Sequence, residues 1–146
     1  MKEAEKENKV ETKENLIEKD WFLQSLVNLS NKGDATIGLT VITHGFLVSG
    51  DLVGGKEYFS GFGEDYTSGV KDDETKKSIL KNFKDVGEKV YGSEKLDTMT
   101  DPSYIHIKGA KFFHPNGNPI PGNRGVWWRG RLSEISGFSL GKLNAE

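Results

Sequence analysis

The spacing of apolar and polar residues changes several times along this chain, and each change predicts a new element. Residues 1–19 are a run of lysine and glutamate with almost no apolar position, so we expect a charged, disordered N-terminal tail. Regular apolar spacing begins at residue 20 and continues almost to the end of the chain. We therefore expect a single domain over residues 20–146.

The first half of this domain predicts a helix followed by a β-hairpin. Asp20 is a favourable N-cap and Lys32–Gly33 a favourable stop for a helix whose apolar residues recur at helical spacing. From Ile37 the period changes to two and the residues are rich in β-branched side chains, which predicts a strand. His44–Gly45 predicts a tight turn, after which residues 46–53 return as a second strand.

The middle of the chain predicts two helices. Gly54–Gly55 ends the second strand and opens a short helix over residues 56–62, and glycines at and after its end predict a loop. A longer helix begins at Asp72–Asp73 and ends at Tyr91, with one apolar stripe that we expect to pack against the core.

The last part of the chain returns to strands. Residues 104–113 predict a strand with a bulge at Gly109, and residues 114–125 predict either an ordered turn-rich loop or a mobile flap. Residues 126–132 and 138–143 predict a final pair of strands joined near Ser136–Gly137. This order of elements indicates an α+β fold, an antiparallel sheet of about five strands with helices packed on one face.

Composition narrows the functional classes. The chain has no cysteine, which excludes disulfides and thiolate-rich metal sites. No apolar run approaches the ~18 residues of a membrane span, and the charged first residues do not form a signal sequence, so we expect a soluble, cytoplasmic protein. Residues 1–101 carry 14 Lys and Arg against 20 Asp and Glu, whereas residues 102–146 carry six against two. This asymmetry favours self-association or a charged partner surface.

Three near-motifs lack the context that their chemistry needs. Residues 50–57 (GDLVGGKE) approach the phosphate-loop pattern, but Glu57 stands where a magnesium-binding hydroxyl is required. Residues 137–141 (GFSLG) match the nucleophile-elbow pattern, yet no histidine or aspartate follows them. His44, His106 and His114 lack metal-site spacing, and we expect them on turns and strand surfaces. We predict no catalytic residue, no metal site and no cofactor.

The most informative cluster is aromatic and basic. In the strand that begins at Val126, Trp128 falls on the side expected to face the core, and Trp127, Arg129 and Arg131 fall on the other side. Together with Lys108 nearby, these three residues are a candidate partner-binding patch, because Trp and Arg are enriched in binding hot spots. The alternative is a tryptophan packed under arginine stems as ordinary surface structure.

Several short segments of the sequence, taken in their order, resemble a known family. Residues 104–108 (YIHIK), 128–131 (WRGR) and 135–143 (ISGFSLGKL), in this order, are similar to the gas vesicle accessory protein GvpU. Residues 45–53 and 56–59 (KEYF) resemble the N-terminal half of the same family, so the resemblance covers about residues 22–143. The charged tail is outside it, and residues 73–91 and the loop after His114 depart from it.

The resemblance implies a non-enzymatic protein that influences how gas vesicles assemble or cluster. Its implied partners are gas vesicle shell proteins or a second copy of the chain, and its implied location is the cytoplasm, at the vesicles. One alternative is a small nucleic-acid-binding module that uses the aromatic and basic sheet surface, although the overall acidity disfavours it. Another is an enzyme that uses scattered acids such as Asp51, Glu57 and Glu134, for which no spacing gives support.

Overall fold

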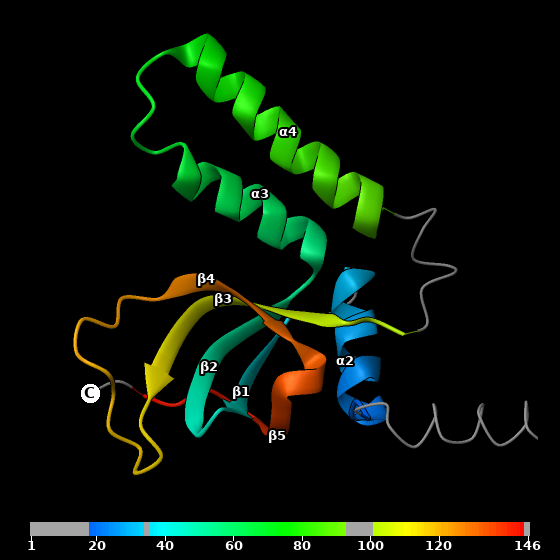
Figure 1. Ribbon diagram of the computed structural model, residues 1–146, viewed down its shortest axis with the longest axis vertical. Coiled ribbons are helices and arrows are strands. Elements are labelled where there is room, and N and C mark those ends of the chain that lie inside the picture. The colour runs from blue at the N-terminus through cyan, green and yellow to red at the C-terminus, as the bar shows by residue number, and fades with distance from the viewer. Residues whose placement is uncertain (1–17, 34–35, 93–100, 145–146) are drawn as a thin grey trace, which may run out of the picture.

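The computed structural model describes residues 18–33, 36–92 and 101–144 (Figure 1). The predicted N-terminal tail lies almost wholly outside these residues, as does part of the connection before Asp101. In chain order the elements are α2 (Trp21–Asn31), β1 (Ile37–Thr43), β2 (Phe46–Val53), α3 (Gly55–Tyr66), α4 (Asp73–Tyr91), β3 (Tyr104–Phe113), β4 (Val126–Arg131), the 3₁₀ turn η1 (Leu132–Glu134) and β5 (Ile135–Leu140).

Local signals place the first elements as predicted. The carboxylate of Asp20 accepts hydrogen bonds from the backbone N–H groups of Phe22, at 2.9 Å, and Leu23, at 3.3 Å. These bonds satisfy two donors of the first helical turn, so α2 begins there. His44 (φ 50°) and Gly45 (φ 80°) both adopt left-handed backbone. Two such residues in succession match the twist of the flanking strands, and they confirm the β1–β2 hairpin.

The five strands form one antiparallel sheet in the order β4-β3-β2-β1-β5, which confirms the predicted α+β fold class. The predicted bulge in β3 is also present. Gly109 has φ 63°, and the register between β3 and β4 shifts between Ile107 and Ala110. The extra residue there bends β3 and increases its twist.

The predicted pairing of the last two strands is wrong. β4 pairs with β3 and β5 pairs with β1, so the two strands lie at opposite edges of the sheet. In a flat sheet these edges would be about 19 Å apart, or four strand spacings. The three residues of η1 join them, and 3₁₀ structure advances only about 2 Å per residue. The sheet must therefore curl, which brings its two edges toward each other.

Leu132 in η1 belongs to the same buried cluster as Leu52 of β2 and Ile107 of β3. The sheet therefore curls around the face that carries these residues, which we call the inner face. Leu23 of α2 packs into this cluster. Neighbouring residues of a strand point to opposite faces, so His106, next to Ile107, lies on the outer face.

The helices cover both faces, in contrast to the prediction of one face. Tyr58 of α3 lies against His106, with ring centroids 4.7 Å apart, which places α3 on the outer face (Figure 1). In β3, Ile105, His106 and Ile107 are all fully buried because helices cover it from both sides.

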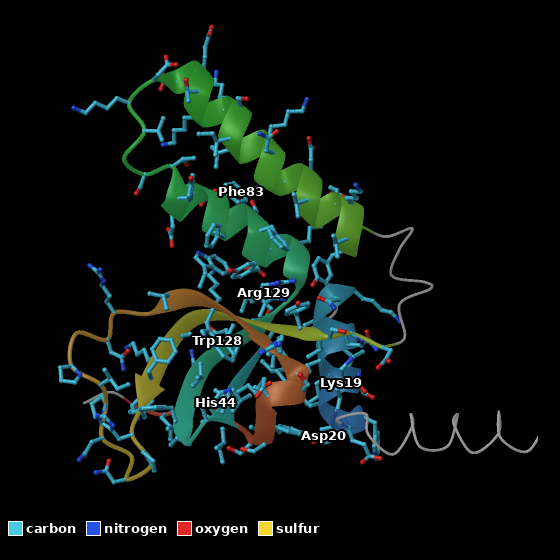
Figure 2. All side chains as sticks on the ribbon, viewed as in Figure 1. Lys19, Asp20, His44, Phe83, Trp128 and Arg129 are labelled. Atoms are coloured by element: carbon cyan, nitrogen blue, oxygen red, sulfur yellow. The ribbon has the colours of Figure 1, made fainter. Side chains whose placement is uncertain are left out.

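The helix α3 continues to Tyr66, beyond the predicted end at residue 62. Two glycines that were expected to mark a loop lie within the helix, where they allow close contacts. A Cβ on Gly61 would lie 1.9 Å from the ring of Trp127, and a Cβ on Gly63 would lie 3.1 Å from Phe83 of α4. Both positions therefore need a residue without a side chain, and neither begins a loop. The aromatic side chain of Phe83 lies between the two helices (Figure 2).

Candidate partner-binding groove

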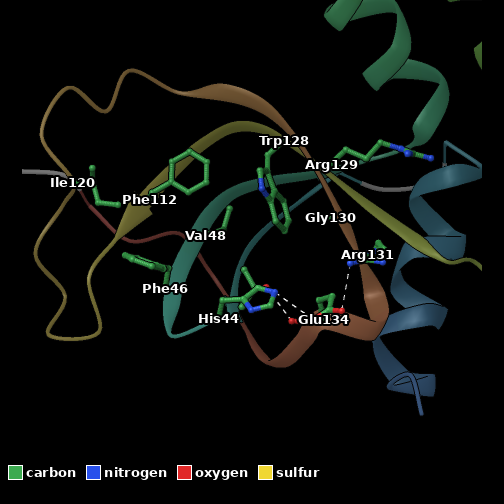
Figure 3. A pocket seen from close by; sticks show the side chains of 11 residues that line it. His44, Phe46, Val48, Phe112, Ile120, Trp128, Arg129, Gly130, Arg131 and Glu134 are labelled. Carbon is green, nitrogen blue, oxygen red and sulfur yellow. Dashed lines mark hydrogen bonds and ion pairs between the residues drawn. The ribbon is translucent and has the colours of Figure 1, made fainter. Parts of the chain in front are cut away.

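The part of the inner face that α2 leaves open forms a groove of about 470 Å³ between the β1–β2 turn, η1 and β4 (Figure 3). Residues from several distant segments line it: Thr43, His44, Phe46, Val48, Phe112, Ile120, Trp128, Arg129, Gly130, Arg131 and Glu134. The curl of the sheet creates this groove, because it brings the hairpin and the end of β4 to one mouth.

The floor of the groove is apolar. Val48 is buried, whereas Phe46, at the start of β2, is 43% exposed although it is aromatic. Trp128 was predicted to be a core residue, and its ring does pack against the core cluster and across Gly130. The ring is only partly buried, however, because its remaining surface lines the groove (Figure 3).

The rim of the groove is polar. Glu134 pairs with Nε2 of His44 at 3.3 Å and with the guanidinium of Arg131 at 3.5 Å (Figure 3). His44 lies in the β1–β2 turn, so this ion pair connects the turn to η1. Arg131 is well exposed, and a guanidinium has five N–H donors, so it can bind a further carboxylate while it remains paired with Glu134.

The four residues of the predicted partner-binding patch lie in two places. Arg131 borders the groove, whereas the side chains of Trp127, Arg129 and Lys108 lie on the outer face. Trp127 is half-buried against Gly61 of α3, so it is not an open plate. The Lys108 ammonium lies 5.6 Å from the centroid of the Trp127 ring and pairs with Glu57 of α3 at 3.5 Å.

Arg129 points away from the groove toward α3 (Figures 2 and 3). Its guanidinium carbon lies 3.6 Å from the centroid of the Tyr104 ring, and its Nε donates to Nε2 of His106 at 3.1 Å. Arg129 therefore contributes mainly backbone to the groove, and Arg131 is the predicted residue whose charge is available at its mouth.

His106 was expected on a strand surface, but it is fully buried on the outer face beneath α3. Burial, with a smaller contribution from the positive charge of Arg129, lowers the pKa of His106 to about 3. The imidazole is therefore neutral near pH 7. The hydrogen bond from Arg129 requires an unprotonated Nε2, so the ring proton is on Nδ1.

The residues considered for an enzymatic site do not come together. Asp51 pairs with Lys142 at 3.2 Å and Glu57 with Lys108 at 3.5 Å, while Glu134 is held at the groove. Within residues 18–33, 36–92 and 101–144 no three histidine or acidic side chains gather as metal ligands. In the same part of the chain no helix combines the length and the apolarity of a membrane span.

The floor of the groove could not be predicted from the sequence, because its residues come from separate segments of the chain. Phe46, Phe112 and Ile120 are far apart in the chain and each looks like an ordinary strand or loop residue. One signal was present. Phe46 follows the turn residues directly, a position at which few neighbouring residues can cover an aromatic side chain.

A family model described as "Gas vesicle protein GvpU-like" matches residues 20–143, which is most of the chain. No curated protein and no solved structure matches the chain.

Proposed function

The chain belongs to the GvpU-like family of gas vesicle proteins, and from this premise we propose that it is a non-enzymatic accessory protein that influences gas vesicle assembly or clustering through protein–protein contacts. Its partners in this proposal are gas vesicle shell proteins or a second copy of the chain. It acts in the cytoplasm, at the vesicle surface.

The observation that carries the proposal is the open apolar groove on the inner face. Phe46, at 43% exposure, and the partly buried Trp128 both line this groove, and together with Val48 they give it an apolar, concave surface of the kind that binds a partner. The strands beneath it form a continuous hydrogen-bonded sheet, so the groove is preformed and little ordering is needed on binding.

The chemistry of the floor and of the rim supports a particular kind of partner segment. Phe46 and Trp128 favour an aliphatic or aromatic side chain, and the exposed guanidinium of Arg131 favours a carboxylate beside it. The partner segment in this proposal is therefore apolar with an adjacent acidic residue.

The alternative of a nucleic-acid-binding surface has less support. It would use Trp127, Arg129 and Arg131, and each of these side chains has an intramolecular partner. Trp127 packs against Gly61, Arg129 donates to His106, and Arg131 pairs with Glu134. Base stacking requires an aromatic face that is open to the ligand.

The test is co-flotation of the purified chain with buoyant gas vesicles. Phe46→Ala combined with Arg131→Ala removes the exposed aromatic ring and the exposed guanidinium at the groove. We expect this double variant to bind vesicles at least about tenfold more weakly, the effect of losing roughly 1.4 kcal/mol at a hot spot. Higher salt should also weaken binding by the unmodified chain, since the Arg131 contact is exposed.

The matched control is Val90→Ala combined with Lys77→Ala, which removes an exposed apolar side chain and an exposed charge from α4. It should bind vesicles like the unmodified chain. Equal binding by the groove variant, with its fold verified by circular dichroism, would rule out the groove as the contact.

A further inference from the structure

A second cavity, of about 480 Å³, lies where the end of α2 meets the start of α3, away from the groove. Its lining comes from the last turn of α2 with the two residues after it, from Gly54 and from the first two turns of α3: Ser30, Asn31, Lys32, Gly33, Gly54, Lys56, Glu57 and Ser60. Among the described residues, the side chains that line the cavity are two lysines, one glutamate, one amide and two serine hydroxyls, so the cavity suits a polar ligand.

The first turn of α3 directs backbone donors into this cavity. β2 ends at Val53, and Gly54 is an N-cap without a side chain to accept a hydrogen bond. The described residues supply no acceptor for the N–H groups of Lys56 and Glu57, which belong to the first helical turn. The positive end of a twelve-residue helix dipole therefore faces the cavity.

Asn31 provides an independent indication of a ligand. Its Oδ1 accepts a hydrogen bond from the N–H of Gly55 at 2.9 Å, which fixes the orientation of the amide. The side chain is only 6% exposed, and its Nδ2 has no acceptor among the residues that the structure describes. A buried donor without a partner costs roughly 1–3 kcal/mol, so an acceptor at this position would remove that cost.

The charges around the cavity favour an anion. Lys32 is exposed at its edge, and Lys56 lines it while pairing with Glu88 at 2.6 Å. Glu57 also lines the cavity, but its carboxylate pairs with Lys108 of β3 at 3.5 Å. Lys56 and Glu57 are thus each neutralised by an ion-pair partner, and the contributions that favour an anion are the charge of Lys32, the helix dipole and the amide of Asn31.

We propose that this cavity binds a tetrahedral oxyanion, a phosphate group, through the N–H groups of Lys56 and Glu57, the Asn31 amide and the ammonium of Lys32. The phosphate is either free inorganic phosphate or a phosphate monoester.

This site is not a nucleotide-binding loop. A Cβ on Gly54 would lie 2.6 Å from the carbonyl oxygen of Ser30, and one on Gly55 would lie 2.4 Å from the Tyr91 ring. Packing against these neighbours requires the two glycines, and a single residue separates β2 from α3, so no loop wraps a phosphate chain.

The test is a titration of the ¹⁵N-labelled full chain with sodium phosphate at constant ionic strength, with sodium chloride as the reference. Saturable shifts are expected at the amides of Lys56 and Glu57 and at the side-chain amide of Asn31. Phenyl phosphate forms a second arm. Tighter binding of the ester would identify a monoester as the ligand, and equal or tighter binding of inorganic phosphate would identify the free anion.

The decisive variant is Asn31→Asp. The carboxylate still accepts from the N–H of Gly55, so α3 keeps its cap, but the donor is lost and a negative charge enters the site. We expect phosphate affinity to fall at least about tenfold, the effect of losing one charge-assisted hydrogen bond. Lys32→Gln, on an exposed side chain, should weaken binding without any change in the fold, and Lys77→Gln on α4 should have no effect.

The proposal is overturned if Asn31→Asp and Lys32→Gln both bind phosphate like the unmodified chain, or if the shifts do not saturate. The groove variants of the flotation assay are expected to keep their phosphate affinity. Failure of one proposal is thereby distinguishable from failure of the other.

Discussion

The His106 side chain shows how burial determines the chemistry of a single residue. Aromatic rings from two helices surround it: Tyr58 at 4.7 Å, Phe59 at 6.2 Å and Tyr91 at 5.5 Å between ring centroids. The charged group facing it is Arg129, whose Nε donates to the ring. A proton on Nε2 would break this hydrogen bond and place two positive charges together, so the buried ring stays neutral.

This environment predicts a specific sensitivity to acid. The pKa of His106 is about 3 in the folded protein, against an ordinary value of 6.5, so between these two values the unfolded chain binds a proton that the folded chain does not. The free energy of unfolding is therefore highest above pH 6.5 and falls as the pH drops toward 3, by at most about 1.4 kcal/mol per pH unit from this residue.

His106→Gln tests the prediction, because glutamine can still accept from Arg129 but does not titrate. Urea denaturation at pH 7.5, 6, 5 and 4 should show the variant less stable at pH 7.5 and less sensitive to acid. His114→Gln, at an exposed histidine, should follow the pH profile of the unmodified chain. Parallel profiles for His106→Gln and the unmodified chain would contradict the assignment.

At the scale of elements, two helical glycines with opposite surroundings predict opposite effects of the same substitution. Gly61 in α3 and Gly87 in α4 are both buried, and alanine at either position would favour the helix by about 0.5–1 kcal/mol. A Cβ at position 61 would lie 1.9 Å from the Trp127 ring, whereas at position 87 the nearest atom is at 3.4 Å, an ordinary contact.

We expect Gly61→Ala to lower stability by about 1–3 kcal/mol, because α3 must move off β4 to admit the methyl group. Gly87→Ala should leave stability unchanged or raise it by up to about 1 kcal/mol. Chemical denaturation of the two variants side by side measures both effects. A stabilising Gly61→Ala would mean that α3 does not rest on Trp127.

Elements with strong local signals could be predicted from the sequence. The Asp20 cap, the His44–Gly45 turn and the Gly109 bulge each depend on one or two residues and their neighbours, and all three are present. The pairing partners of β4 and β5 could not be predicted, because strands at opposite edges of a sheet and strands of one hairpin have the same alternation. Gly61 and Gly63 have the sequence pattern of a loop, whereas the physical reason for them, close contact with Trp127 and Phe83, is tertiary and is not visible in the sequence.

The candidate groove was predictable only in part for the same reason. The aromatic and basic pattern of β4 pointed to Arg131, which is at the rim. The same pattern could not show that α3 covers Trp127, since this contact comes from a helix more than sixty residues earlier in the chain. The curl of the sheet, which depends on the short η1 connection, then determines which faces are open.

At the scale of the whole molecule, the structure divides into a curled sheet and a helical hairpin of α3 and α4 that projects from its outer face (Figure 1). β1, β2 and β3 each pair with strands on both sides and carry most of the buried core. α4 packs mainly on α3, and only Gly87 and Tyr91 in it are buried. Since stability follows local burial and hydrogen bonding, the hairpin and the sheet should open at different free energies.

Native-state hydrogen exchange should therefore give α4 amides an opening free energy at least about 2 kcal/mol below that of β2 and β3, whose amides exchange through global unfolding.

Phe83→Ala tests whether the helical hairpin opens separately from the sheet. Phe83 contacts Phe62 and Tyr66 across the hairpin, each with ring centroids 5.4 Å apart, and none of these rings belongs to the core cluster of the sheet. The variant should lower protection throughout α4 and in the second half of α3 and leave the central strands nearly unchanged. A matched Val48→Ala change in the core should instead lower protection in the strands, through loss of a fully packed side chain. Equal loss of protection in hairpin and sheet for Phe83→Ala would show that the chain opens as one cooperative unit.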